Sequence, residues 1–166
     1  HSCGIDEDSR IQCWGRDNQG QSTAPTTLFV EVSAGYAHTC GITVLGTISC
    51  WGDDASLQVS EAPTSNNWEH IAVATNHSCA LDSDGRIECW GDNTSGQINH
   101  SNSPGHQTVD AGADHTCSIM STSGANCWGG NDYSQATDQL NLSFEKVSGG
   151  EKHTCGLKDD GFLEIG

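Results

Sequence analysis

Cysteine and histidine are the residues of this sequence best suited to metal binding, nucleophilic catalysis or covalent cross-linking, and both recur at fixed spacing. Five of the nine cysteines stand 37 to 39 residues apart, and a histidine precedes each of them by two positions. The first four of these are followed ten residues later by a second cysteine. The leading cysteines are Cys3, Cys40, Cys79, Cys117 and Cys155, and the second ones are Cys13, Cys50, Cys89 and Cys127.

The segment between two paired cysteines indicates what they do. Residues 79–89 have the pattern of two short strands around an Asp84-Gly85 turn, because Asp and Gly tolerate positive φ. Cysteines opposed across such a hairpin lie within reach of a disulfide. Zinc is the alternative, but the sequence has none of the C-x2-C pairs that zinc sites favour. We therefore predict one disulfide per hairpin: Cys3–Cys13, Cys40–Cys50, Cys79–Cys89 and Cys117–Cys127.

Further residues share this period. A Trp-Gly pair follows each second cysteine, and a Gln stands seven residues past each Trp. An apolar phrase precedes the motif, clearly at 29–35 and 144–150 and more loosely at 68–74 and 108–112. These offsets predict one repeat domain over residues 1–166, built of four units of about 38 residues and part of a fifth, with motifs near residues 1, 38, 77, 115 and 153. The recurring residues are Trp14, Trp51, Trp90 and Trp128, and Gln21, Gln58, Gln97 and Gln135.

The fifth unit departs from the pattern. Ile165 stands where the second cysteine belongs and Gly166 where Trp belongs. Cys155 is therefore expected to be unpaired, or to form an intermolecular disulfide.

Composition points to an all-β, extracellular protein. Gly, Ser, Thr, Asn and Asp are abundant, which favours short antiparallel strands joined by turns. The net charge of −16 repels phosphate backbones, so we expect no nucleic-acid partner. No run of 18 apolar residues predicts a membrane span. Disulfides imply an oxidising compartment, so we expect the protein to be secreted or at the cell surface. Candidate glycosylation sites agree with this location at Asn76, Asn93, Asn99 and Asn141.

The repeat resembles that of the regulator-of-chromosome-condensation family. The phrase is carried by His77-Ser78-Cys79-Ala80, Gly85, Ile87, Cys89-Trp90-Gly91, Asn93 and Gly96-Gln97. The short, cysteine-paired version is similar to secreted bacterial members, among them a β-lactamase-inhibiting propeller, and to ectodomain repeats of plant crinkly-type receptor kinases. The resemblance implies a seven-bladed β-propeller. Seven such units need about 266 residues, so these 166 residues are incomplete relative to that ring.

Residues that recur once per repeat are expected to be architectural. The histidines His38, His77, His115 and His153, with His1, could ring an axis as metal ligands, but one polar residue per repeat more often satisfies buried polar groups. The four motif tryptophans are expected to pack between blades. The Asp-rich turns offer too few oxygens for Ca²⁺, so we expect no cofactor, with Ca²⁺ at these turns as the alternative. No catalytic motif is present, and we predict that the protein is not an enzyme.

The predicted function is an extracellular protein-interaction or assembly module, either self-associating as a homo-oligomer or part of a longer propeller. The alternatives are a secreted inhibitor, or a receptor or adhesin domain that binds a protein or glycan through its blade loops. Guanine-nucleotide exchange on a small GTPase is disfavoured by the cysteines and by the lack of a basic tail. A partner would contact the loops that vary between units, at 22–28, 59–67, 98–106 and 136–143.

Overall fold

The computed structural model describes residues 1–100 and 103–165, and all regular structure in that part of the chain is β-strand. The strands form five antiparallel sheets, called blades 1 to 5 below. Blade 1 has β1 (Ser2–Ile5) and β2 (Ile11–Trp14). Blade 2 has β3 (Phe29–Ala34), β4 (His38–Thr43) and β5 (Ile48–Gly52). Blade 3 has β6 (Trp68–Val73), β7 (His77–Asp82) and β8 (Ile87–Gly91). Blade 4 has β9 (His106–Ala111), β10 (His115–Met120) and β11 (Ala125–Gly129). Blade 5 has β12 (Phe144–Gly149), β13 (Thr154–Lys158) and β14 (Leu163–Ile165).

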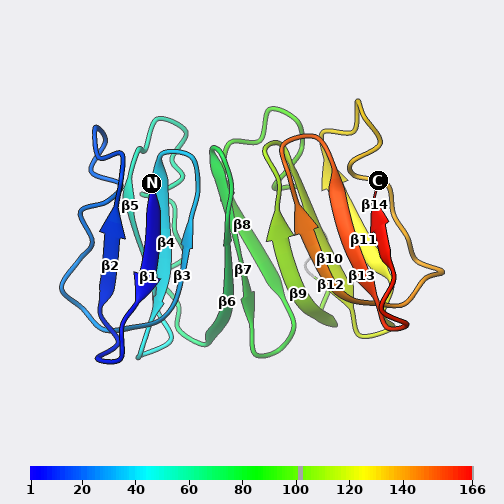
Figure 1. Cartoon of the computed structure of the whole chain (residues 1–166), viewed down its shortest axis with the longest axis horizontal. Coiled ribbons are helices and arrows are strands. Elements are labelled where there is room, and N and C mark those ends of the chain that lie inside the picture. Colours follow the sequence, from blue (N-terminus) through cyan, green and yellow to red (C-terminus); the bar gives the residue numbers. More distant parts are fainter. Residues whose placement is uncertain (101–102, 166) are drawn as a thin grey trace.

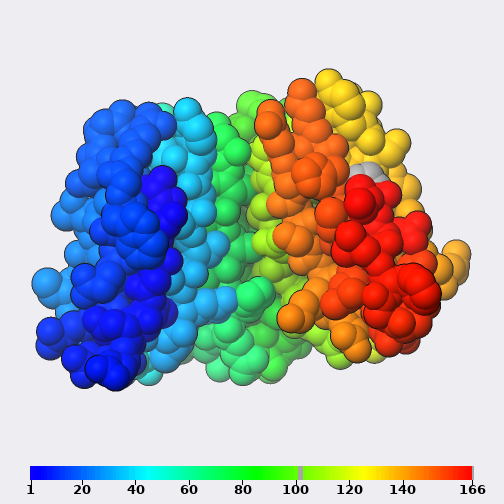
Figure 2. Space-filling view, in the orientation of Figure 1, coloured from blue at the N-terminus to red at the C-terminus, as the bar shows by residue number. Residues whose placement is uncertain are grey.

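The blades follow one another in sequence order to form an open arc. Each of blades 2 to 5 is a three-stranded antiparallel sheet with the second strand of the unit in the middle. The first strands, β3, β6, β9 and β12, contact one another from blade to blade, so they form the inner side of the arc. Blades 1 and 5 lie at opposite ends of the molecule (Figure 1, Figure 2). The expected all-β, incomplete propeller is confirmed.

The second and third strands of each unit form the predicted hairpin. Cys79 pairs directly with Cys89 across β7 and β8, and the other three cysteine pairs lie in the same register. All four expected disulfides are present, with Cα–Cα distances of 4.0 to 4.1 Å. At the turn, Asp82 Oδ1 accepts the backbone N–H groups of Asp84 and Arg86 at 2.9 and 2.8 Å. The one disulfide per hairpin predicted from the sequence is confirmed.

A large side chain opens every inner strand. Phe29, Trp68 and Phe144 occupy this position, and the fourth member is His106. The repeat pattern matches this unit only from residue 108 and so does not include His106. The residue twelve positions after this side chain lies in the middle strand and is small in every unit, because the ring of the first residue fills the space beside it. A Cβ at Gly41 would come within 2.7 Å of the Phe29 ring.

In blade 4 the corresponding contact is between two polar side chains. His106 Nδ1 lies 2.8 Å from the hydroxyl of Ser118, which is the residue twelve positions on in this unit. The aromatic-on-glycine contact of blades 2 and 5 is replaced here by a buried hydrogen bond. The core is otherwise a series of apolar layers between blades, such as Ile42 of blade 2 with Trp68 and Trp90 of blade 3.

Candidate interaction surface

The recurring histidines join neighbouring blades. Four of the five motif histidines place Nε2 within hydrogen-bond distance of a Ser or Thr hydroxyl in the next blade. The distances are 2.6 Å for His1–Thr39, 2.8 Å for His38–Ser78, 2.9 Å for His77–Thr116 and 2.8 Å for His115–Thr154. The hydroxyl partner is the residue that follows the motif histidine in its own unit. The His-Ser/Thr-Cys phrase is therefore a repeated inter-blade contact, which we call the seam.

A threonine hydroxyl fixes the tautomer of the His77 ring. Thr116 Oγ1 donates its hydrogen to the carbonyl oxygen of Gln97 at 3.0 Å. The same oxygen must then accept the hydrogen bond from His77, so His77 carries its proton on Nε2. Its Nδ1 is buried without a hydrogen-bond partner. Burial lowers the pKa of His77, and that of His38, to about 4, which agrees with neutral rings.

The recurring glutamines supply the second half of the seam. The backbone carbonyl oxygens of Gln21, Gln58 and Gln97 accept the indole Nε1–H of the Trp in the next blade. The distances are 2.9 Å to Trp51, 2.9 Å to Trp90 and 2.8 Å to Trp128. Each Gln side chain is buried and its Oε1 accepts the backbone N–H two residues earlier. The side chain thus holds the loop so that the carbonyl faces the neighbouring blade. The sequence showed the spacing of these glutamines but not this role.

Trp14 is the exception among the motif tryptophans. It is 61% exposed, whereas Trp51 and Trp90 are 8% and 3% exposed. In blades 2, 3 and 4 the corresponding indole bonds to the preceding blade, and Trp14 pairs in the same register, with Ser2, as Trp51 does with Thr39. His153 in blade 5 is likewise exposed. The two ends of the arc therefore carry uncovered halves of a seam.

The candidate metal ligands do not gather at one centre. Each of His38, His77 and His115 bonds across its own seam. Asp6 and Asp82 in the hairpin turns accept backbone N–H groups of their own turns. Within residues 1–100 and 103–165, no group of three or more His, Cys, Asp or Glu side chains could hold a metal ion. In the same ranges, no helix has the length and apolar character to cross a membrane.

The fifth hairpin contains the one free cysteine of the described chain. Cys155 pairs in register with Ile165 and is half-buried. Gly166 lies outside the described residues. Among the candidate glycosylation sites, Asn93, Asn99 and Asn141 are exposed and Asn76 is half-buried. The Asn93 side-chain amide donates to Asn99 Oδ1 at 2.9 Å, and Ser101 of the Asn99 sequon lies outside the described residues.

The loops that follow each Trp-Gly pair are held at their start and exposed beyond it. An Asp or Asn side chain accepts the backbone N–H five residues later in each unit. From that point the units diverge, in 22–28, 59–67, 98–106 and 136–143, and most described residues there are exposed or half-buried. Residues 101–102 of the third loop lie outside the described part. The anchoring residues are Asp17, Asp54, Asn93 and Asn131.

These loops begin at the same edge as the turns between the first and second strands of each blade, because His38 pairs with Gly52 and His77 with Gly91. We call this the upper edge, which is at the top in Figure 1. A hollow of about 610 Å³ lies on it, lined by Tyr36, Thr75, Ala113 and Glu151 from the turns of four blades. Tyr36 is 64% exposed, with the Arg16 guanidinium 5.2 Å from its ring centre.

Comparison with known proteins agrees with this geometry. Residues 29–58 and 68–97 match the family described as the regulator of chromosome condensation (RCC1) repeat. No curated protein sequence matches the chain significantly.

Solved structures share the fold at low identity. The entire ectodomain of the Physcomitrella patens receptor kinase CR4 matches with a TM-score of 0.80 and 22% identity over 98% of this chain and 48% of its own. The CRINKLY WD40 ectodomain of the Arabidopsis thaliana receptor kinase ACR4 matches with a TM-score of 0.78 and 23% identity over 99% and 60%. Yeast RCC1 (Prp20), solved with Kap60, matches with a TM-score of 0.80 and 16% identity over 98% and 53%. The chain thus spans about half to three-fifths of these structures. The resemblance deduced from the sequence is confirmed, and blades 2 and 3 contain repeats of the RCC1 type.

Proposed function

We propose that this chain is an extracellular, non-enzymatic protein-interaction module that binds its partner at the upper edge. One observation carries the proposal: the motif His and Gln side chains are buried in the inner seams, whereas most described residues of the loops that differ between units are exposed or half-buried. The motif His and Gln side chains of the inner seams are buried, as with His77 and Gln58 at 0%. A surface that varies on a repeated scaffold is the part free to recognise a partner.

The chemistry of the upper edge suits a protein partner. The hollow between Tyr36 and Glu151 is concave and is built from turns of four blades. Tyr and Arg, which meet at Tyr36 and Arg16, are enriched in protein interfaces. The net charge of −16 favours a partner with a basic surface, whose association would slow as salt screens the attraction.

Two features support an extracellular location. Four disulfides persist in oxidising compartments. Two of the structures that share the fold are receptor-kinase ectodomains.

The uncovered face of blade 1 favours a second role, assembly. We propose that Trp14 is covered in the working protein by a further blade, supplied either by a longer chain or by a second copy. Light scattering on the 166-residue chain tests the second source. A homo-oligomer that dissociates in the Trp14→Ser variant would support it, and a wild-type monomer would exclude it.

The interaction proposal is tested by screening the protein against panels of secreted and cell-surface proteins and glycans. A protein ligand should lose at least tenfold in affinity with Tyr36→Ala and with Thr75→Arg. The matched control is Leu45→Ala, because Leu45 is 78% exposed in the β4–β5 hairpin at the opposite edge. A ligand that depends on Leu45 and not on Tyr36 would place the interface elsewhere.

A further inference from the structure

Each of the first three seams contains a tryptophan. Among the described residues, the seam between blades 4 and 5 has none. Its polar half is complete: His115 Nε2 lies 2.8 Å from Thr154 Oγ1, and Thr154 donates to the Gln135 carbonyl at 2.7 Å. No tryptophan of the described residues supplies an indole to it. Ile165 pairs with Cys155, as Cys50 pairs with Cys40, and the residue after Ile165 in the sequence is Gly166, where the other units have Trp.

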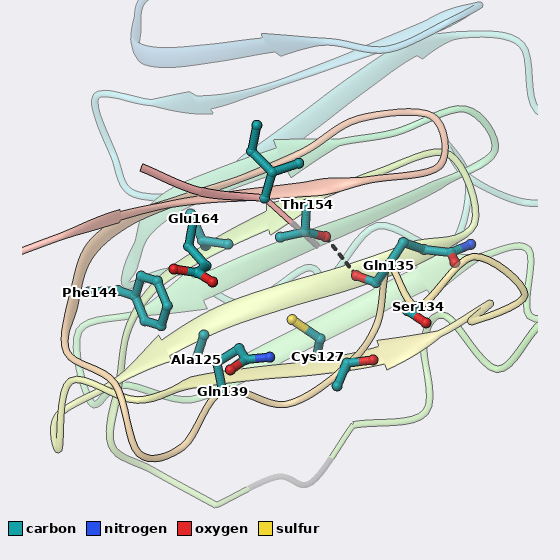
Figure 3. Close-up of a pocket in the computed structure, with 12 residues that line it drawn as sticks. Ala125, Cys127, Ser134, Gln135, Gln139, Phe144, Thr154 and Glu164 are labelled. Atoms are coloured by element: carbon teal, nitrogen blue, oxygen red, sulfur yellow. Dashed lines mark hydrogen bonds between the residues drawn. The ribbon is translucent and has the colours of Figure 1, made fainter. Parts of the chain in front are cut away.

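A cavity lies at this place. It has a volume of about 240 Å³, and Figure 3 shows Ala125, Phe144, Gln135 and Thr154 around it. Ile165 also lines it. The dashed line in Figure 3 is the hydrogen bond from Thr154 to Gln135.

The lining residues are the counterparts of those that surround Trp51 between blades 1 and 2. There Trp51 packs with Ile11 and Phe29, and its ring centre is 5.9 Å from that of Phe29. Its Nε1–H donates to the Gln21 carbonyl. By repeat position, Ala125 corresponds to Ile11 and Phe144 to Phe29. The walls of an indole site are thus present between blades 4 and 5.

We propose that this cavity binds an indole ring with a free N–H, presented by a tryptophan side chain of a partner polypeptide. The Gln135 carbonyl accepts the indole N–H on its second lone pair, and Phe144 contacts the ring. A volume of about 240 Å³ suits one ring system and is smaller than the roughly 300–1,000 Å³ of pockets for drug-sized ligands. A tryptophan side chain is the occupant because blades 2, 3 and 4 each place one at this position. The site is separate from the proposed upper-edge interface.

The binding test uses N-acetyl-tryptophanamide as the probe, followed by calorimetry and thermal shift. We expect saturable binding to one site and a rise in Tm. The same probe methylated on the indole nitrogen should bind about three- to tenfold more weakly, because it cannot donate to Gln135. Free indole tests whether the natural ligand is a polypeptide side chain or a small molecule. If free indole binds more tightly than the tryptophan probe, the natural ligand is a small molecule and the side-chain assignment is overturned. Equal affinity of the methylated probe would overturn the hydrogen bond to Gln135.

Two variants locate the site. Gly166→Trp supplies the missing indole from the chain itself, so it should raise Tm and abolish probe binding. Leu163→Trp is the matched control, because it adds a tryptophan to the same strand at a position 61% exposed and outside the cavity lining. It should leave probe binding unchanged. The proposal is overturned if Gly166→Trp binds the probe like the wild type, or if the wild type shows no saturable binding. Both results leave the upper-edge interface unaffected.

Discussion

The seam between blades 2 and 3 and the seam between blades 4 and 5 share the histidine–hydroxyl contact but differ in the indole. In the first, His38 bonds to Ser78 and the Trp90 indole bonds to the Gln58 carbonyl, with Trp90 only 3% exposed. In the second, the histidine–hydroxyl bond has the same length, and a cavity lies where the indole would be. The histidine–hydroxyl bond is therefore present in a seam that has no indole among its described residues, where Ile119 and Ala125 still pack against Phe144.

The two halves of a seam differ in what they contribute. A hydrogen bond adds a net of about 1 kcal/mol to stability, since folding exchanges it for bonds to water. Burial of a large aromatic ring contributes several times as much. We infer that the histidine and hydroxyl fix the register between blades, and that the tryptophan supplies most of the seam's free energy.

Truncation of the indole should have the largest effect. Trp90→Ala should lower the free energy of unfolding by about 3–5 kcal/mol, because it leaves a cavity in a closed seam. Trp14→Ala, in the exposed end blade, should cost less than about 1 kcal/mol. Urea denaturation of the two variants makes the measurement. Equal losses would show that burial in the seam is not what stabilises these residues.

The next comparison is between the hairpin of blade 3, which has a disulfide, and the hairpin of blade 5, which has none among its described residues. Replacing Cys79 and Cys89 together by Ala should cost about 2–3 kcal/mol, because the cross-link restricts the unfolded chain. Cys155→Ala removes no cross-link and should change stability by less than about 1 kcal/mol. Peptide mapping without reduction should recover four links within hairpins. A link such as Cys13 to Cys40 would contradict the register.

Loss of a seam hydroxyl should have a smaller effect than loss of an indole. Thr116→Val keeps the side-chain shape but removes the partner of His77 Nε2–H and a donor to the Gln97 carbonyl. Buried groups left without partners cost about 1–3 kcal/mol. Thr64→Val, at an exposed loop position, is the control and should be near neutral. The Tm values of the two variants should differ by several degrees. Identical unfolding curves would show that the Thr116 hydroxyl does not stabilise the seam.

Acid should weaken the seams gradually. Burial is the main cause that lowers the pKa of His77 to about 4, opposed in part by Asp92 and Asp114. The folded state therefore binds fewer protons than the unfolded state, whose histidine has a pKa near 6.5. The stability from this neutral ring is complete above about pH 6.5 and is lost as pH falls toward 4, by at most about 1.4 kcal/mol per pH unit. His77→Gln should flatten that part of the stability profile, and an unchanged slope would contradict it.

Much of this architecture could be predicted because it follows from spacing. The ten residues between the two cysteines of a unit predict the disulfides, because this spacing places both cysteines opposite each other in a hairpin in all four units. His106 could also have been found by counting, because it stands 38 residues from both Trp68 and Phe144. It was missed because a histidine does not match an apolar pattern, and its hydrogen bond to Ser118 is visible only in three dimensions.

The seam chemistry could not be predicted in the same way. The glutamines act through their backbone carbonyls, and a carbonyl is the same in every residue. The identity of Gln58 matters only because its side chain holds the loop. The cavity beside Phe144 depends on which residues meet across two blades, so Gly166 read alone indicates only a departure from the repeat.

The seam itself is tested most directly by a double-mutant cycle on His77 and Thr116. The free energies of unfolding are measured for His77→Ala, Thr116→Val and the double variant, with His77 and Thr64 as the unconnected control pair. Because the two side chains meet at 2.9 Å in a buried site, the first pair should show a coupling of about 1–2 kcal/mol. The control pair should be additive within about 0.5 kcal/mol. Additivity of His77 and Thr116 would contradict the claim that the repeated motif joins one blade to the next.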